Sequence, residues 1–184
     1  MSWGLSLAAW ALLATLAQAL PPTPLAWQGS LTEPWRVFTA AFVHWTPWHL
    51  TMNLAGCAAL AVLGWRAALG PRDAVALWLA LPLTQLGLLL KPDLVSYGGL
   101  SGVLHAATSI AACALLARGA ARERWVGAAI ALGLAVKLVL EQPWGPALQT
   151  VQGLDFPLAP WAHLCGAGAG LLAWAGSRIG RHGT

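Results

Sequence analysis

The sequence predicts an all-α membrane protein built as one bundle of six transmembrane helices. Of its 184 residues, 58% are hydrophobic and only 9% are charged, whereas soluble domains carry roughly 25% charged residues. The mean hydropathy is +0.66. Charges and prolines divide the chain into six apolar runs spread from residue 3 to residue 176. We therefore expect a single domain over residues 1–184.

Each run is close to the length that a membrane crossing requires. The runs cover residues 3–20, 49–65, 74–90, 98–117, 125–140 and 160–176. The first ends before the prolines of residues 21–24, the second at Arg66, and the third at Lys91 and Pro92. A helix rises 1.5 Å per residue, so about 20 residues cross the ~30 Å hydrocarbon core. Six compact helices are expected.

The first run also has one feature of a secretory signal peptide. Ala17, Gln18 and Ala19 match the small-x-small form of a cleavage site. However, no Lys or Arg precedes the run, and signal peptides begin with a positively charged region. We expect the first helix to be retained.

The basic residues predict the orientation of the bundle. Seven of the ten fall at one end: Arg66, Arg72, Arg118, Arg122, Arg124, Arg178 and Arg181. The opposite end has only Arg36 and Lys91. The positive-inside rule then places both termini in the cytoplasm. This topology accounts for the basic composition, and no basic stripe with interleaved aromatic residues indicates a nucleic-acid partner.

Polar residues inside the apolar runs mark a candidate site, because polar groups are costly in hydrocarbon. They are His49 and Asn53 in the second run, Ser101 and His105 in the fourth, and His163 in the sixth. These three runs all start on the non-cytoplasmic side, so their first turns lie at similar depth. We expect them to line a water-accessible pocket just below the outer face.

Ser101 and His163 have the chemistry of a nucleophile and its base. Ser101 follows residues 98–100 at a helix start, where free N–H groups and the helix dipole favour an oxyanion. A serine hydroxyl is activated by an imidazole within hydrogen-bond reach. His49 and Asn53, four residues apart, offer two further donors from one helix face.

No acidic residue is expected to complete a triad, and no metal or other cofactor is implied. The acidic residues all lie in loops or at helix ends: Glu33, Asp73, Asp93, Glu123, Glu141 and Asp155. A Ser-His dyad is therefore predicted. Lys137 and Glu141, four residues apart, are interpreted as a local ion pair or snorkelling pair outside the site. The three cysteines lie in apolar runs without zinc-ligand spacing.

Four short motifs follow one another along the chain: Glu33-Pro-Trp35-Arg36, then His44 with His49-Leu-Thr-Met-Asn53, then Gly99-Leu-Ser101-Gly102, then Ala162-His163-Leu-Cys-Gly166-Ala-Gly-Ala-Gly170. Together, in this order, they resemble the rhomboid family of intramembrane serine proteases. The resemblance implies a six-helix rhomboid-like bundle with Ser101 as nucleophile and His163 as general base. His49, Asn53 and the Ser101 amide would hold the oxyanion. Other motif residues would support the site: Gly99 and Gly102 beside the nucleophile, His44, Trp35 and Arg36 in the first outer loop, and Gly166 and Gly170 where the sixth helix approaches the fourth.

His105 departs from the family pattern, since a tyrosine is common at its position. Three roles are open: a stacking platform for His163, a packed core histidine, or the general base itself. A membrane cytochrome with His105 and His163 as haem ligands would leave the Ser101 motif unexplained.

The run Gly-Leu-Ser-Gly-Val-Leu-His at residues 99–105 resembles the rhombosortase branch. That branch implies secreted substrates anchored by a C-terminal Gly-Gly motif, a transmembrane helix and a basic tail. It also implies a multi-pass protein of the bacterial inner membrane, with the active site facing the periplasm. The alternatives are a rhomboid protease with other single-span substrates, or a non-catalytic rhomboid-like binding protein.

We expect substrate to approach beside the fifth helix, with residues 142–159 as a mobile cap. No oligomeric state is predicted.

Overall fold

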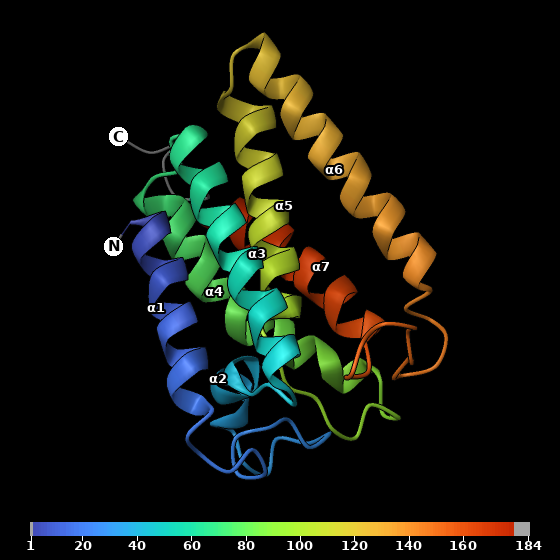
Figure 1. The fold of residues 1–184 in the computed structure, drawn as a ribbon. Helices are drawn as coiled ribbons and strands as arrows, with labels where there is room; N and C mark the ends of the chain where they lie inside the picture. Colours follow the sequence, from blue (N-terminus) through green and yellow to red (C-terminus); the bar gives the residue numbers. More distant parts are fainter. Residues whose placement is uncertain (1, 179–184) are drawn as a thin grey trace.

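The computed structural model describes residues 2–178, which form an all-helical bundle (Figure 1). The α-helices are α1 (Trp3–Ala17), α2 (Arg36–Thr39), α3 (Pro47–Arg66), α4 (Pro71–Gly87), α5 (Ser101–Arg118), α6 (Ala121–Glu141) and α7 (Pro160–Gly176). Two 3-10 helices, η1 (Ala40–Phe42) and η2 (Leu88–Leu90), complete the set. The all-α class is confirmed. Arg181, one of the basic residues used to predict orientation, lies outside the described residues.

The six predicted runs correspond to α1, α3, α4 with η2, α5, α6 and α7. The prediction missed α2 and η1, which are short helices in the first outer loop. It also placed four boundaries three or four residues from their positions in the structure, including the starts of α4 at Pro71 and of α6 at Ala121. The first helix ends at Ala17 rather than residue 20, ahead of a proline-rich segment that cannot continue a helix. The fourth begins at Ser101 rather than residue 98, because Gly99 has φ +134°, which is not helical.

Two helices of the described chain are long and apolar enough to cross a membrane by themselves: Pro71–Leu90 and Ser101–Arg118. Trp3–Ala17 is apolar but shorter. The count of six spans and the cytoplasmic position of the termini therefore remain predictions.

The central helix is α5, which packs against α3, α4, α6 and α7. The peripheral helix is α6, which slopes away from the other helices in Figure 1 and buries only Gly127. A Cβ atom at Gly127 would lie 3.1 Å from the Ala112 carbonyl oxygen of α5. The bundle is therefore tight around α5 and α7 and more open along α6.

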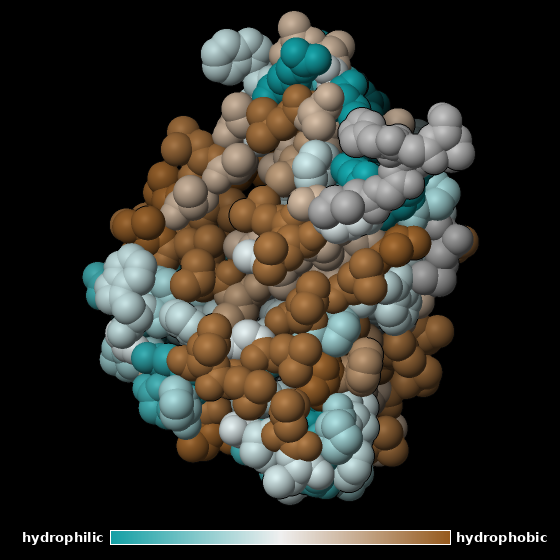
Figure 2. Space-filling model, turned by 180° about the vertical axis from the view of Figure 1, so that it is seen from behind, coloured by the Kyte–Doolittle hydropathy of each residue, from teal (hydrophilic) through white to brown (hydrophobic). Residues whose placement is uncertain are grey.

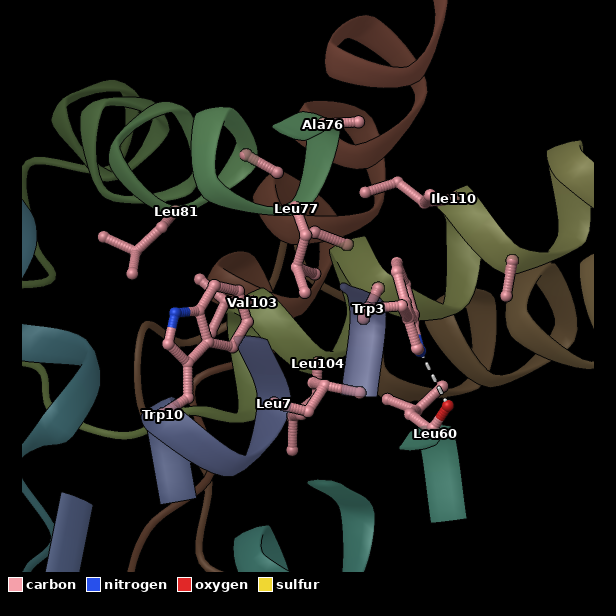
Figure 3. Close-up of a cluster of buried hydrophobic side chains, with 14 of the residues drawn as sticks. Trp3, Leu7, Trp10, Leu60, Ala76, Leu77, Leu81, Val103, Leu104 and Ile110 are labelled. Carbon is pink, nitrogen blue, oxygen red and sulfur yellow. Dashed lines mark hydrogen bonds between the residues drawn. The ribbon is translucent and has the colours of Figure 1, made fainter. Parts of the chain in front are cut away.

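One face of α1 belongs to the hydrophobic core. Trp3, Leu7, Trp10 and Ala14 are buried at helical spacing. Figure 3 shows the first three of these beside core residues of α3, α4 and α5, with the Trp3 indole N–H donating to the Leu60 carbonyl at 2.9 Å. This packing makes α1 a structural part of the bundle, whereas its retention in the mature protein stays a prediction.

The outer surface is extensively apolar. Figure 2 shows a hydrophobic band across one face, with hydrophilic residues gathered above and below it. Large apolar side chains are exposed on several helices, including Leu12, Val62, Leu132 and Leu172 at 59–70% exposure. Soluble monomers rarely expose contiguous apolar surface of this kind. The surface is suited to contact with lipid.

Asp73 joins three helices at the basic end of the bundle. Its carboxylate is fully buried and accepts hydrogen bonds from the Gly70 amide, Arg118 and Arg178 at 2.7–2.9 Å. These partners lie at the start of α4, at the end of α5 and after α7, so the carboxylate ties three helix ends together. It also neutralises the two arginines.

Candidate active site

Ser101 and His163 lie together at the starts of α5 and α7. The Ser101 hydroxyl is 3.1 Å from Nε2 of His163. The His163 side chain is only 3% exposed. A buried imidazole in hydrogen-bond reach of a serine is the arrangement that activates the hydroxyl as a nucleophile.

Glycines allow α7 to approach α5 closely enough for this contact. A Cβ atom on Gly166 would overlap the carbonyl oxygen of Gly102 and lie 2.6 Å from its carbonyl carbon. One turn further on, a Cβ atom on Gly170 would lie 2.8 Å from the Ala106 Cα atom. The two backbones are therefore in direct contact, and this contact positions His163 beside Ser101.

Tyr97 fixes the turn before Ser101, a role that sequence reasoning missed. Its hydroxyl donates to the Gly99 carbonyl at 2.9 Å and accepts from the Gly102 amide at 3.3 Å. Its backbone pairs with Trp27 of the first outer loop. It is the only tyrosine in the chain. Its place two residues before Gly99 was the one sequence feature that could have indicated this role.

His49 and Asn53 of α3 border the same turn. A Cβ atom at Gly99 would lie 2.8 Å from Nε2 of His49 and 3.8 Å from Nδ2 of Asn53. His49 Nδ1 accepts a long hydrogen bond of 3.5 Å from the Trp45 amide, which leaves the proton on Nε2. Asn53 uses one N–H on the His49 carbonyl at 3.2 Å and retains a second. Both side chains thus have a donor available beside Ser101.

Residues of the 142–159 loop cover the site. Phe156 stacks on the His49 ring with centroids 4.1 Å apart, and the Thr46 hydroxyl donates to Asp155 at 2.9 Å. A cavity of about 180 Å³ lies beside Ser101 between this loop and the helix starts, with Trp45, Tyr97 and Phe156 among its lining residues.

Arg36, Trp35 and His44 lie in the segment between α1 and α3, which includes α2 and η1. Arg36 is buried and donates to Glu33 at 2.8 Å and to the carbonyls of Thr23 and Ala26. The Trp35 indole donates to the Pro24 carbonyl at 3.1 Å. These bonds hold the segment between α1 and α3 folded.

His44 connects that segment to the site. Its Nδ1 lies 3.1 Å from the Phe42 carbonyl, and its ring meets His49 edge-on with centroids 4.8 Å apart. Burial lowers the pKa of His44 to about 4, so the ring is neutral at physiological pH. A neutral His44 avoids placing positive charge against His49.

His105 lies beneath the His163 ring. The two rings are stacked with centroids 4.1 Å apart and an angle of 11° between their planes. Its Nδ1 is 2.6 Å from the Ser101 carbonyl oxygen, to which it donates. The hydroxyl of Ser101 faces His163, so this geometry favours the stacking role over the general-base role.

Replacing His105 separates these roles. We expect His105→Ala to lower kcat about tenfold, because stacking of this kind contributes on the order of 0.5–1.5 kcal/mol. His105→Tyr keeps an aromatic surface and should retain most of the activity. Initial rates of cleavage in detergent would measure both variants. Equal loss in the alanine and tyrosine variants would rule out a stacking platform.

No acidic residue was expected to complete a triad, but one lies beside His163 in the structure. Oε2 of Glu141 lies 2.7 Å from Nδ1 of His163. The predicted ion pair between Lys137 and Glu141 is present as well, through the other carboxylate oxygen. Glu141 is the last residue of α6, and its position at a helix end did not reveal that the first turn of α7 lies beside it.

His105, Glu141 and His163 bring one potential metal-ligand atom each within 4.8 Å of one another. Glu141 and His163 are already hydrogen-bonded to each other, and His105 Nδ1 is bonded to the Ser101 carbonyl. These contacts satisfy the groups without an ion. Glu141, His163 and the Ser101 hydroxyl form a hydrogen-bonded chain, and the His105 ring stacks on that of His163.

A serine, an imidazole and nearby N–H donors inside an apolar helical bundle are the arrangement expected of a serine hydrolase that works within a membrane. The family model described as the Rhomboid domain matches residues 31–178. The chain therefore belongs to the rhomboid family, whose members are integral membrane proteins and intramembrane serine proteases. Comparison with curated protein sequences found no match.

Proposed function

We propose that this chain is a serine endopeptidase that cleaves membrane-anchored proteins, with Ser101 as nucleophile and His163 as general base. The observation that carries the proposal is the 3.1 Å contact between the Ser101 hydroxyl and Nε2 of His163. The burial of His163 and the fixed helix start at Ser101 support it.

The proposed reaction has two stages. The Ser101 hydroxyl attacks the substrate carbonyl while its proton passes to Nε2 of His163. His49, Asn53 and the backbone at Ser101 donate hydrogen bonds to the oxyanion. His163 then gives the proton to the leaving amine, and water releases the acyl-enzyme by the same proton transfers.

The proposed substrate is a single-span anchor that approaches from the side of α6. A largely apolar groove of about 410 Å³ runs between α3, α5 and α6, and it reaches His105 beneath the site. Small residues, Gly56 and Gly133, line it from two of these helices. A helical anchor could pack against this surface as transmembrane helices pack on small residues.

We further propose the rhombosortase branch, with C-terminal Gly-Gly anchors as substrates. The run from Gly99 to His105 supports this assignment. The small cavity beside Ser101, lined in part by Trp45 and Phe156, is also suited to residues with little side-chain volume. The proposed setting is the bacterial inner membrane, with the site facing the periplasm and the arginine-rich end facing the cytoplasm.

The test is cleavage in membranes of two reporters, one with a Gly-Gly C-terminal anchor and one with an unrelated single-span anchor. We expect the wild-type chain to cleave the Gly-Gly reporter alone, and Ser101→Ala to lose at least about 10⁴-fold in rate. Cleavage of both reporters would keep the mechanism and reject the narrow specificity. Cleavage that persists in Ser101→Ala, or is absent from the wild type, would reject the protease mechanism for these substrates.

A further inference from the structure

We propose that Glu141 is a positioning residue for His163, so that the working unit is a chain of Ser101, His163 and Glu141 with Lys137 behind it. This inference rests on the proposed function and deepens it. It replaces the Ser-His dyad expected from the sequence with a carboxylate-supported base.

The two nitrogens of His163 face different partners. Nε2 lies 3.1 Å from the Ser101 hydroxyl, and Nδ1 lies 2.7 Å from Oε2 of Glu141. An ionised carboxylate can only accept, so Nδ1 must carry the proton. Nε2 then presents its lone pair to Ser101. Glu141 thereby selects the one tautomer that can take the serine proton.

The carboxylate also has an electrostatic role during the reaction. When the proton leaves the Ser101 hydroxyl and bonds to Nε2, the proton on Nδ1 stays in place and the ring becomes cationic. His163 is almost completely buried, where an unpaired charge is costly. A carboxylate at hydrogen-bond distance supplies the opposite charge at that moment.

Lys137 keeps the carboxylate available for this role. Its ammonium group donates to Oε1 of Glu141, one helical turn away, while Oε2 remains directed at His163. The Lys137 side chain is 47% exposed and that of Glu141 is 15% exposed. The ion pair thus links a nearly buried carboxylate to the surface and favours its charged form.

The end of α6 is held in the position that this contact needs. Gln142 adopts a left-handed conformation and ends the helix directly after Glu141. The Gln149 side chain then donates to the Glu141 carbonyl at 2.9 Å. These contacts order the end of α6, whose last residue lies beside His163 in the first turn of α7.

The decisive variant is Glu141→Gln, measured with purified protein in proteoliposomes. We expect kcat to fall by about 10²- to 10⁴-fold with KM changed less than about threefold, because the amide can hold the wrong tautomer. We also expect the acidic limb of the rate profile to move to lower pH, since the protonated imidazole loses its counter-charge. Glu123→Gln makes the same change at the opposite end of α6 and should leave both parameters unchanged.

Two further variants make the test independent of folding effects. Lys137→Met combined with Glu141→Gln removes the ion pair as a unit, leaves no unpaired charge, and should lose as much kcat as Glu141→Gln alone. Glu141→Asp keeps a carboxylate and should recover part of the activity. A kcat within about threefold of wild type in the double variant, with an unmoved pH profile, would overturn the inference.

Ser101→Ala in the same assay separates this inference from the proposed function. If Ser101→Ala is inactive and the Glu141 variants remain fully active, the protease assignment stands and only the role of Glu141 fails. If Ser101→Ala still cleaves, the proposed function itself has failed.

Discussion

Gly166→Ala is expected to abolish cleavage and to destabilise the bundle by about 3 kcal/mol or more. The added methyl group would overlap the backbone carbonyl of Gly102 on α5. No rotamer change relieves a clash between two backbones, so α7 must move away by at least ~1.5 Å to reach an ordinary contact distance. The 3.1 Å contact between His163 and Ser101 would then be lost.

Gly168→Ala is the matched control for this prediction. Gly168 lies on the same helix, two residues away, and a Cβ atom there would have no neighbour within 4 Å. Both substitutions raise helix propensity equally, so any difference reports the contact with α5. Thermal unfolding in detergent and initial cleavage rates measure the two effects. Gly166→Ala with the stability and activity of Gly168→Ala would show that the helices are not in backbone contact.

Most of the helical layout could be predicted because apolar runs and their breaks are local features. Prolines and charges located five of the six long helices to within three residues at each end. The exception is α6, which begins at Ala121 and not at residue 125. The start of α5 was misplaced because the conformation of Gly99, with φ +134°, depends on its contacts with α3 and Tyr97. Those contacts are tertiary and leave no periodic signal.

The sequence was sufficient to predict which end of the bundle the site residues share, but not all of their contacts. Parity along the chain placed His49, Asn53, Ser101 and His163 below one surface, and the structure brings them around a single turn at Gly99. Glu141 was missed because the tilt of α6 determines which helix start its last residue meets. Such tilts are set by side-chain packing between helices, which spacing along one chain does not encode.

Asn53→Ala is expected to lower kcat by about 10²- to 10³-fold, or roughly 2.7–4 kcal/mol of transition-state stabilisation, with little change in KM. The Asn53 amide lies beside Gly99, where the oxyanion would form in the proposed reaction. A donor that engages only this developing charge stabilises the transition state more than bound substrate. The fold should tolerate the change, because within residues 2–178 the side chain bonds only to the His49 carbonyl of its own helix.

Thr51→Ala provides the matched control for Asn53→Ala. Thr51 lies on the same helix, and its hydroxyl makes the same kind of bond, to the Pro47 carbonyl at 2.8 Å, but its side chain is exposed. Asn53→Asp, which keeps the size and removes the N–H donors, should be at least as inactive as Asn53→Ala. Steady-state kinetics on the preferred reporter would compare the three. If Asn53→Ala matched Thr51→Ala in kcat, the oxyanion would have to be held by His49 and the backbone at Ser101, and Asn53 would be a structural residue of α3.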